Sequence, residues 1–440
     1  MVANIQSGKA ATFTNTGSLS YALILHQATA LANGQVLVSG GEYFGNGFVI
    51  STDSELYIPN LGTWAETGNL NYQRYSHTAT LLTNGRVLVA GGFDIANATI
   101  YTAEIFNPAT ASWSETGRLN SPRGGHTATL LPNGNVLVAG GIVSGSPSSS
   151  TEEYNPTTGQ WTLTGPMQGA HVYHTATLLS NGKVLIAGGN SSFGISSVSE
   201  IYDPATGKAT RTGNMNLTRE FHSATLLANG RVLVAGGWKT SGYLSGCEFF
   251  DPASGTWTNT GGMSVARAYH SAALLTNGYV LVVGGKYSNS NVLSSAEVYD
   301  PTTGFWGTTA TMSSARFSGS ATLLQNGKVL IAAGGYYCQL GYCYPSAVNG
   351  FPLSTAELYD FGLIPPGYNQ ISGRIMNLGS VQLSYVGMSG WNYALDRSFS
   401  LSPASWIPQA TNPADANGNL VFTNMPNSTT NNFWRIRSVP

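Results

Sequence analysis

The sequence predicts an all-β protein built as a ring of seven four-stranded units. The first observation is a repeat: a segment of the type His-Thr-Ala-Thr-Leu-Leu-x-Asn-Gly-x-Val-Leu-Val-Ala-Gly-Gly recurs about every 50 residues. The second is composition, because only 9% of the 440 residues are charged while 54 are glycine, as in turn-rich β structure. A chain of this length can hold one large β architecture and a small second domain.

Seven copies of this segment can be aligned. Five nearly identical copies begin at His77, His126, His174, His222 and His270. A looser first copy begins at His26. The seventh begins at Gly319, where Gly replaces His, and we interpret it as having one Ala inserted before its double glycine.

Each copy predicts four strands. Two short apolar strands are joined at Asn-Gly, which favours a tight hairpin because both central residues need positive φ. The third strand, of the type Ala-Glu-Ile-Tyr-Asp-Pro, carries Glu55, Glu104, Glu152, Glu200, Glu248, Glu297 and Glu357 in register. After a turn, the fourth strand carries Trp64, Trp113, Trp161, Trp257 or Trp306, with Ala209 at this position of the fourth copy.

Four antiparallel strands in a unit of this length match one blade of a β-propeller. The double glycine, the Tyr-Asp-Pro strand and the spaced Trp resemble the kelch family over about residues 10–362. The resemblance implies a seven-bladed kelch β-propeller. It does not select a function, because kelch propellers serve as enzymes, adaptors and binding scaffolds.

The two ends of the repeat region indicate how the ring closes. The seventh copy has no Trp strand after Tyr359-Asp360, whereas Thr12–Gly17 aligns with the fourth strand Thr256–Gly261. We therefore expect the N-terminal strand to complete the last blade, which removes exposed sheet edges. Deletion of residues 1–18 is expected to destabilise the ring.

A different alternation begins near Pro365. Its candidate strands are Gln370–Met376, Val381–Gly387, Asn392–Ser398, Leu420–Asn424 and Asn432–Val439. The sequence therefore predicts a propeller at residues 1–364 and a small β-sandwich-like module at 365–440, resembling C-terminal modules of secreted bacterial proteins.

Charge and hydropathy exclude several classes of function. With 19 basic and 20 acidic side chains and no basic cluster, nucleic-acid binding is disfavoured. No apolar stretch is long enough to cross a bilayer, and Met1–Ala11 is not a signal sequence. The low charge favours an extracellular or cell-surface protein whose signal peptide is absent from this chain. We expect a disulfide between Cys338 and Cys343 with Cys247 unpaired; three reduced thiols are the alternative.

The candidate binding residues lie on one face of the ring. Strands alternate in direction, so the variable loops after the second and fourth strands share a face, and variable loops on a rigid scaffold commonly bind ligands. The candidates are Tyr43, Phe93, Trp238, Tyr243, Tyr287, Tyr336 and Tyr337 from the former loops, and Arg74, Tyr173, Arg219, Phe221, Arg267 and Tyr269 from the latter. Such a face suits stacking on sugar rings or burying part of a partner; ordinary loop packing is the alternative for each aromatic.

The residues that recur in every copy favour a structural role. A repeated His most simply makes the same hydrogen bond in each blade. Repeated Glu and Arg side chains suggest ion pairs that fasten blade to blade. His171 and His174 form a His-x-x-His pair, which is a weak metal signal on a loop that enters a strand.

A copper enzyme is an alternative hypothesis. Arg267-Ala-Tyr269-His270 and the loop with Cys338 and Cys343 resemble parts of galactose oxidase-type copper-radical enzymes, which implies Tyr269 and His270 as copper ligands. That family also needs a Tyr cross-linked to Cys and a His from the following domain, but no His follows His270. We therefore expect no cofactor and no catalytic residue, with copper as the alternative.

We expect a secreted or surface-associated, non-enzymatic binding or structural protein that recognises a glycan or a protein through its variable loop face. A sugar-directed enzyme is the second hypothesis, either the copper oxidase or a hydrolase using carboxylates such as Glu42, Asp94 or Glu220. The third is a subunit of an extracellular assembly.

Overall fold

The computed structural model describes residues 11–44, 48–288, 290–335 and 353–362, and the backbone of six strands between residues 371 and 439. The chain divides into two compact units. One contains Ala11–Leu275 and Tyr279–Asp360, and the other contains Met1–Ala10, Thr276–Gly278 and Phe361–Pro440. The predicted boundary at residues 364 and 365 stays a prediction.

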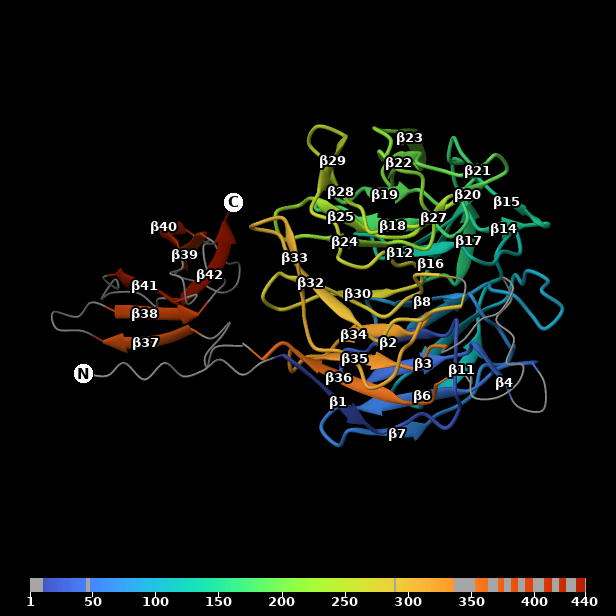
Figure 1. Ribbon diagram of the computed structural model, residues 1–440, viewed down its shortest axis with the longest axis horizontal. Helices are drawn as coiled ribbons and strands as arrows, with labels where there is room; N and C mark the ends of the chain where they lie inside the picture. The colour runs from blue at the N-terminus through green and yellow to red at the C-terminus, as the bar shows by residue number, and fades with distance from the viewer. Residues whose placement is uncertain are drawn as a thin grey trace. The chain divides into compact units, whose positions relative to one another are not determined.

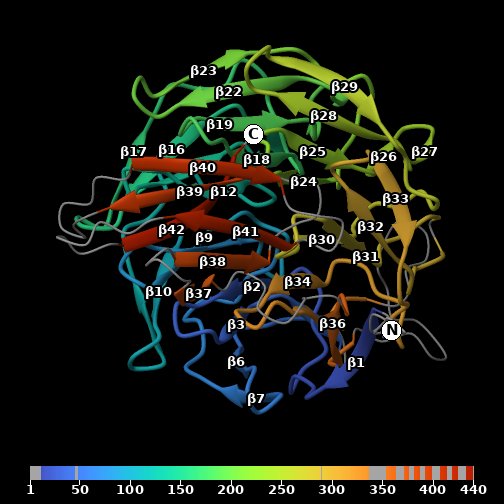
Figure 2. The same cartoon turned by 90° about the vertical axis from the view of Figure 1, so that its left-hand side faces the viewer.

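The larger unit is a seven-bladed β-propeller, as predicted (Figures 1 and 2). Each blade is a four-stranded antiparallel sheet. The innermost strands are neighbours in the cyclic order β2, β8, β12, β18, β24, β30, β34 and back to β2. No helix occurs in the described residues, and accordingly none of them forms a helix able to span a membrane.

The strands of blades 1 to 4, from the axis outward, are as follows. Blade 1 has β2 (Gln27–Ala30), β3 (Val36–Ser39), β6 (Ser54–Ile58) and β7 (Thr63–Glu66); blade 2 has β8 (Thr78–Leu81), β9 (Val87–Ala90), β10 (Ala103–Asn107) and β11 (Ser112–Glu115). Blade 3 has β12 (Thr127–Leu130), β13 (Val136–Ala139), β16 (Thr151–Asn155) and β17 (Gln160–Leu163); blade 4 has β18 (Thr175–Leu178), β19 (Val184–Ala187), β22 (Ser199–Asp203) and β23 (Lys208–Arg211).

Blades 5 to 7 follow the same order. Blade 5 has β24 (Ser223–Leu226), β25 (Val232–Ala235), β28 (Cys247–Asp251) and β29 (Thr256–Thr260); blade 6 has β30 (Ser271–Leu274), β31 (Val280–Val283), β32 (Ala296–Asp300) and β33 (Phe305–Thr308). Blade 7 has β34 (Ser320–Leu323), β35 (Val329–Ala332), β36 (Ala356–Asp360) and, as its outermost strand, the N-terminal β1 (Thr12–Thr16).

The predicted closure by the N-terminal strand is confirmed. Strand β1 pairs antiparallel with β36, and Phe13 lies opposite Tyr359. Their ring centroids are 4.9 Å apart, so Phe13 takes the place that Trp holds in five other blades.

The hydrophobic core lies between neighbouring blades. Each second strand is apolar on both faces, as in Val136 and Val138 of β13, which pack with Leu88 and Ala90 of β9 and are all about fully buried. Because each blade buries one face against the next, closing the ring leaves no blade without a neighbour on either side.

Four two-stranded hairpins extend the loops after the second strands. They are β4 (Glu42–Phe44) with β5 (Phe48–Ile50), β14 (Ile142–Val143) with β15 (Ser146–Pro147), β20 (Asn190–Ser191) with β21 (Gly194–Ile195), and β26 (Trp238–Lys239) with β27 (Gly242–Tyr243). The labelled strands of these hairpins, such as β4, β14 and β20, lie on one side of the propeller in Figure 1. This side is called the loop face below.

The smaller unit contains two three-stranded antiparallel sheets. One has the order β37 (Ile371–Ile375), β38 (Val381–Val386), β41 (Asn419–Asn424), and the other β40 (Ile407–Pro413), β39 (Asn392–Ser398), β42 (Phe433–Val439). Five of these strands overlap predicted ranges, and β40 was missed because Pro408 and Pro413 argue against a strand. Strand β40 is an edge strand, where proline is tolerated. The sandwich stays a prediction.

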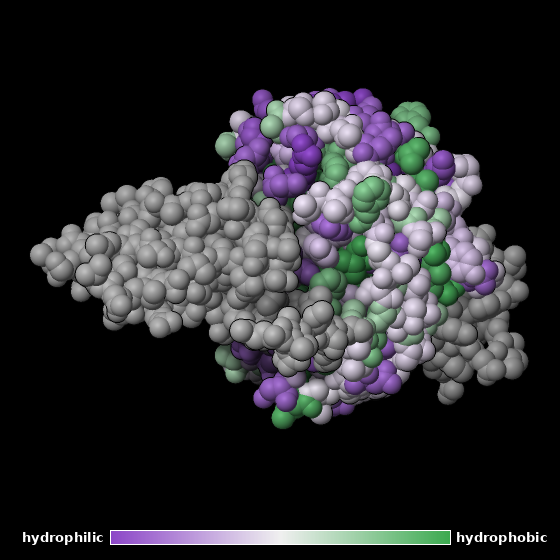
Figure 3. All heavy atoms as spheres, turned by 60° about the vertical axis from the view of Figure 1, so that its left-hand side comes forward, coloured by the Kyte–Doolittle hydropathy of each residue, from purple (hydrophilic) through white to green (hydrophobic). Residues whose placement is uncertain are grey.

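The described surface agrees with the sparse charge of the sequence. In the view of Figure 3, most described residues are pale, the colour of intermediate hydropathy, and hydrophilic and hydrophobic residues are interspersed. The polar surface is therefore largely made of uncharged side chains.

Candidate binding site at the loop face

The centre of the loop face is a ring of seven residues, one from each blade, that directly precede the first strand's His position. All seven have the left-handed backbone conformation, with φ between 47° and 65°. They are Leu25, Ser76, Gly125, Tyr173, Phe221, Tyr269 and Ser318. Only Gly125 is a glycine, so the other six adopt a conformation that costs about 1 kcal/mol or more each.

Hydrogen bonds between neighbouring blades hold this central ring. Six consecutive backbone N–H groups donate to the carbonyl of the same position in the preceding blade, from Ser76 to Leu25 (3.2 Å) through to Ser318 to Tyr269 (2.9 Å). Because the backbone pairs around the axis, the side chains of the central ring are free to differ from blade to blade.

The double glycine positions the segment that leads into the central ring. The second residue of each pair donates its backbone N–H to a carbonyl of the next blade, as Gly41 does to Arg74. The accepting residue stands three residues before the His position of that blade, and the distance is 2.8 Å in all seven copies. A Cβ on Gly41 would lie 2.7 Å from the carbonyl oxygen of Ile24, so only glycine fits. In blade 7 the pair is Ala333-Gly334, with Ala333 at φ 55°. Our interpretation of an inserted Ala was wrong: Ala333 replaces the first glycine.

The recurring Arg and Glu form ion pairs, as predicted, but each pair lies within one blade and not between blades, so that part of the prediction was wrong. The Arg side chain of the entering loop donates to the Glu of the same blade at 2.6 to 2.8 Å in five blades, as in Arg123 with Glu152, while its carbonyl accepts from the preceding blade. In blade 4, His171 replaces the Arg, and its Nε2 lies 3.3 Å from Glu200 Oε1. The first residue of the His-x-x-His pair therefore has a structural partner. In blade 1, Leu23 replaces Arg and the N–H of Ser20 donates to Glu55.

Three predicted binding residues therefore have structural partners. The guanidinium groups of Arg74, Arg219 and Arg267 are 0% exposed. Each donates to a carboxylate and to backbone carbonyls, as Arg219 does to Glu248, Gly236 and Gly246. The structure places these arginines beneath the loop face, where their terminal nitrogens bond the scaffold and their buried Nε atoms have no described partner.

The recurring His is also a blade-to-blade contact. The Nε2 of five histidines lies 2.9 to 3.1 Å from the first hydroxyl of the preceding blade's inner strand, as His126 does from Thr78. Burial lowers the pKa of His126 to about 3, so the ring is neutral. Among the described residues, His77 has no hydrogen-bond partner at either nitrogen, because Gln27 stands where the other blades carry Ser or Thr. Where Gly319 replaces His, Ser271 donates to its carbonyl.

Three neighbouring blades place large aromatic side chains in the central ring. The rings of Tyr173 and Phe221 lie 4.5 Å apart, and those of Phe221 and Tyr269 stack at 4.0 Å with an angle of 22°. We call Tyr173, Phe221 and Tyr269 the aromatic arc. Tyr173 also lies against Gly125, where a Cβ would come within 2.8 Å of its ring. Phe221 therefore has a neighbouring ring on either side, and all three residues of the arc are half-buried.

Two opposite charges flank the aromatic arc. Glu220 is 3% exposed and its Oε2 has no hydrogen-bond partner. Burial raises the pKa of Glu220 to about 7, which the Asn190 side chain partly offsets. Lys286 is 8% exposed, with its Nζ 4.7 Å from the Phe317 ring and 5.6 Å from the Tyr269 ring. No salt bridge joins either residue to a described partner.

The other predicted residues are spread around the loop face. Phe93 is buried against Tyr75, Trp238 pairs with Tyr243 across a hairpin, and Tyr43 contacts Tyr21. Tyr287 is exposed. Tyr336, Tyr337, Cys338 and Cys343 lie outside the described residues, and Cys247 is a buried free thiol.

Sequence reasoning missed Lys286 and Phe317. The repeat alignment could have indicated Lys286. In every blade, the residue after the double glycine forms a β-bridge with the loop that leads into the blade's own inner strand, as Lys286 does with Ala268 and Trp238 with Glu220. Aligning this position across copies singles out Glu42, Phe93, Asn190, Trp238 and Lys286 as the bulky polar or aromatic choices.

Comparison with known proteins agrees with these repeats. A family model described as the Kelch motif matches residues 123–168 and 267–313, and each match begins at one of the buried arginines. The chain is a kelch-repeat propeller. No curated protein matches it.

Among solved structures, this kelch propeller is similar to a novel fungal alcohol oxidase of the AA5 family, in complex with copper. The identity is 18%, the TM-score is 0.65, and the match covers 95% of this chain and 93% of that chain. An identity this low shows the shared fold alone.

The copper ligands implied by the resemblance do not come together in the described part of this kelch propeller. His270 directs its Nε2 to the Ser223 hydroxyl at 2.9 Å. Burial, followed by the Glu220 charge, raises the pKa of the Tyr269 phenol, which disfavours the phenolate that a metal would bind. Within the described ranges, no three His, Cys, Asp or Glu side chains form a group that fits a metal. The expectation of no cofactor stays a prediction.

Proposed function

We propose that this kelch propeller is a non-enzymatic binding module and that its loop face docks a segment of a protein partner on the aromatic arc. The observation that carries this proposal is the stacked arc of Tyr173, Phe221 and Tyr269 beside Glu220, whose Oε2 has no described hydrogen-bond partner, and Lys286, which no described salt bridge holds. Kelch propellers serve as adaptors and binding scaffolds, which supports it.

The geometry of the arc favours a protein over a stacked sugar. A sugar ring binds by lying on the face of an aromatic ring, but the faces of Phe221 at the centre of the arc are occupied by Tyr173 and Tyr269. The packed, half-buried rings form a rigid apolar pad with little side-chain entropy left to lose. Such pads of Tyr and Phe are typical centres of protein interfaces.

The flanking charges define the chemistry of the partner. Glu220 holds a buried acceptor oxygen without a described donor, and Lys286 holds a largely buried ammonium group without a described carboxylate, so the Glu220 side chain must turn outward to meet a partner. A segment with an aliphatic or aromatic side chain next to a Lys or Arg would place its apolar group on Phe221 and its cation on Glu220. The fully exposed Phe193, at the tip of the β20–β21 hairpin, adds an apolar contact at the rim.

We propose an extracellular or cell-surface location for this module, on the basis of its low charge and its Ser- and Thr-rich repeats. Self-association into a larger assembly remains a separate proposal, which light scattering after size-exclusion chromatography tests directly.

Selection of displayed random peptides on the purified full chain tests the docking proposal. We expect enrichment of peptides that combine an apolar side chain with a neighbouring Lys or Arg. Phe221→Ala should weaken the selected peptides about tenfold or more, and Glu220→Gln should weaken basic peptides selectively. Gln160→Ala, an exposed residue on the outer strand β17, is the matched control and should change nothing.

Two results would overturn the proposal. Peptides that bind Phe221→Ala as tightly as the original chain would place the interface elsewhere. Enrichment of no peptide, together with glycan-array binding that Phe221→Ala abolishes, would make the loop face a glycan site.

A further inference from the structure

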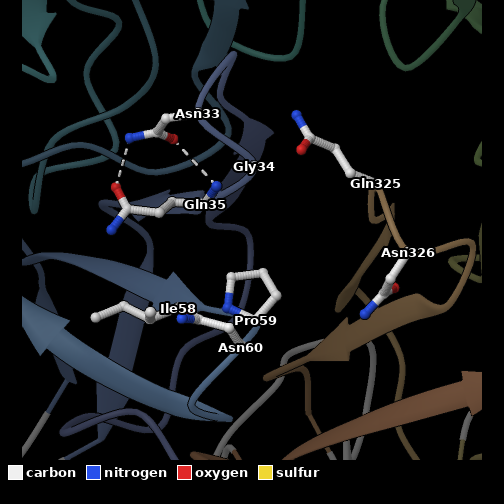
Figure 4. Close-up of a pocket in the computed structure, with 8 residues that line it drawn as sticks. All are labelled: Asn33, Gly34, Gln35, Ile58, Pro59, Asn60, Gln325 and Asn326. Atoms are coloured by element: carbon white, nitrogen blue, oxygen red, sulfur yellow. Dashed lines mark hydrogen bonds between the residues drawn. The ribbon is translucent and has the colours of Figure 1, made fainter.

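A cavity of about 440 Å³ opens on the propeller face opposite the hairpins (Figure 4). Its walls come from three turns: β2–β3 and β6–β7 of blade 1, and β34–β35 of blade 7. It therefore lies at the seam where the first and last blades meet. The lining residues are Asn33, Gly34, Gln35, Ile58, Pro59, Asn60, Gln325 and Asn326.

The repeat supplies an internal comparison, because three other blades have an ion pair at the corresponding positions. The start of the second strand is tied to the end of the third by Lys183–Asp203 at 3.0 Å in blade 4 and by Arg231–Asp251 at 3.5 Å in blade 5. Lys328–Asp360 does the same at 3.5 Å in blade 7. In blade 1 the two positions are Gln35 and Ile58, which cannot form this pair.

Gln35 turns to its own hairpin instead. Asn33 donates from its side-chain nitrogen to Gln35 Oε1 at 2.8 Å and accepts the N–H of Gln35 at 3.1 Å. Figure 4 shows this pair on one side of the gap and Gln325 and Asn326 on the other. The amide nitrogen of Gln35 is left without a described partner and can donate to a ligand.

The outer turn of blade 1 departs from the repeat in a second way. In blades 2 to 6 an Asn or Asp begins this turn and its side chain accepts the N–H two residues later, as Asp203 does from Ala205 at 2.9 Å. Blade 1 has Ile58 at the first position and Asn60 at the third. The turn thus exposes an apolar surface and one additional amide toward the cavity.

The blade 7 turn adds a third departure. The position of Gln325 holds the shorter Ala32, Thr83, Pro132, Ser180 and Ala228 in blades 1 to 5. Gln325 reaches across the seam and donates to the Ala32 carbonyl at 3.2 Å. Its Oε1 would lie 2.8 Å from a Cβ on Gly34, whose φ is 86°, so the close approach requires glycine.

These departures share one chemistry. Five of the eight lining side chains are amides, each with donors and acceptors; none of the eight is charged, and Ile58 and Pro59 are apolar. Paired amides beside a small apolar surface match the hydroxyl groups and C–H face of a sugar, and a neutral lining offers no counter-charge to an ionic ligand. We propose that the seam cavity binds a neutral saccharide. This site is independent of the protein docking proposed for the loop face.

Calorimetric titration with cellotetraose, maltotetraose and galactotetraose tests the proposal. The Phe221→Ala chain is used throughout, so that the aromatic arc does not contribute heat. We expect at least one of these oligosaccharides to bind, and Gln325→Ala and Asn60→Ala each to weaken it about tenfold, the effect of losing one well-made hydrogen bond. Gln160→Ala is the matched control and should bind as before.

Hydrogen exchange locates the site without relying on affinity. The bound oligosaccharide should slow exchange in peptides covering the turns at Gly34 and Asn60, and not in those covering the equivalent turn at Gly182 in blade 4. Circular dichroism and thermal melting confirm that each variant is folded. Binding that Gln325→Ala and Asn60→Ala leave unchanged, protection elsewhere, or no binding by any of the three oligosaccharides would overturn the proposal.

Discussion

The backbone N–H of Tyr269 donates to the carbonyl of Phe221 at 3.1 Å, while the rings of the same two residues stack at 4.0 Å. Both residues have φ near 55°, the left-handed conformation. The backbone contact is repeated around the central ring, but the ring stacking occurs only in the aromatic arc. The repeat therefore builds a uniform support on which single substitutions create an asymmetric site.

The N-terminal strand should stabilise the ring through Phe13. We expect Phe13→Ala to lower the free energy of unfolding by about 2 kcal/mol, because its half-buried ring packs on Tyr359. Phe305→Ala is the matched control, since Phe305 is largely exposed on an outer strand, and should cost less than about 0.5 kcal/mol. Urea denaturation measures both, and equal losses would argue against closure by β1 as a stabilising contact.

The buried ion pairs predict a large penalty for removing one partner. Arg123→Leu leaves the Glu152 carboxylate buried without its guanidinium and should cost about 3 to 5 kcal/mol. The double variant Arg123→Leu/Glu152→Gln should recover part of that loss, because no uncompensated charge remains. A double variant no more stable than the single one, measured by chemical denaturation, would show that packing and backbone contacts dominate.

The missing hydrogen bond of His77 suggests a stabilising substitution at Gln27. Gln27→Thr supplies the hydroxyl that other blades offer to the equivalent His, and should raise the free energy of unfolding by about 1 kcal/mol. Gln27→Ala removes the long side chain without adding a hydroxyl and is the control. If both variants have the same denaturation midpoint, the missing hydrogen bond is not the cause of any change.

Glu220 predicts a pH dependence of stability. Its pKa is raised to about 7 in the folded chain from an ordinary 4.5, so the folded state keeps a proton that the unfolded state loses between these values. The contribution of the Glu220 carboxyl group to the free energy of unfolding is complete below pH 4.5 and is lost as the pH rises through 7. Glu220→Gln avoids this loss, and its stability relative to the original chain should increase by about 1 to 2 kcal/mol from pH 5 to pH 8.

The groups that face Glu220 do not mask this effect. Tyr173 and Tyr269 have pKa values that are raised mainly by burial and stay neutral over this range, and Asn190 does not titrate. Glu66→Gln, at an exposed carboxylate of β7, is the control and should show a flat difference. A flat difference for Glu220→Gln as well would mean that its carboxyl group is hydrated and titrates normally.

The repeat made the scaffold predictable. Because the same residues recur in seven copies, the strands, the closure by β1 and the structural roles of His and Arg followed from self-alignment. Predictions failed where one copy departs from the pattern locally, as with Ala333, or where proline enters an edge strand, as in β40. The buried arginines looked like binding residues because a loop position does not reveal which way a long side chain turns.

By itself, the sequence determined the fold class, the number of blades and the residues that repeat, since periodicity is a property of the chain alone. The tertiary structure decided which of the non-repeating residues act together. The closeness of Glu220 and Lys286 to the aromatic arc, and the amides that meet at the seam of blades 1 and 7, join residues from separate blades. Such contacts depend on side-chain direction and burial across neighbouring blades, which spacing along the sequence does not contain.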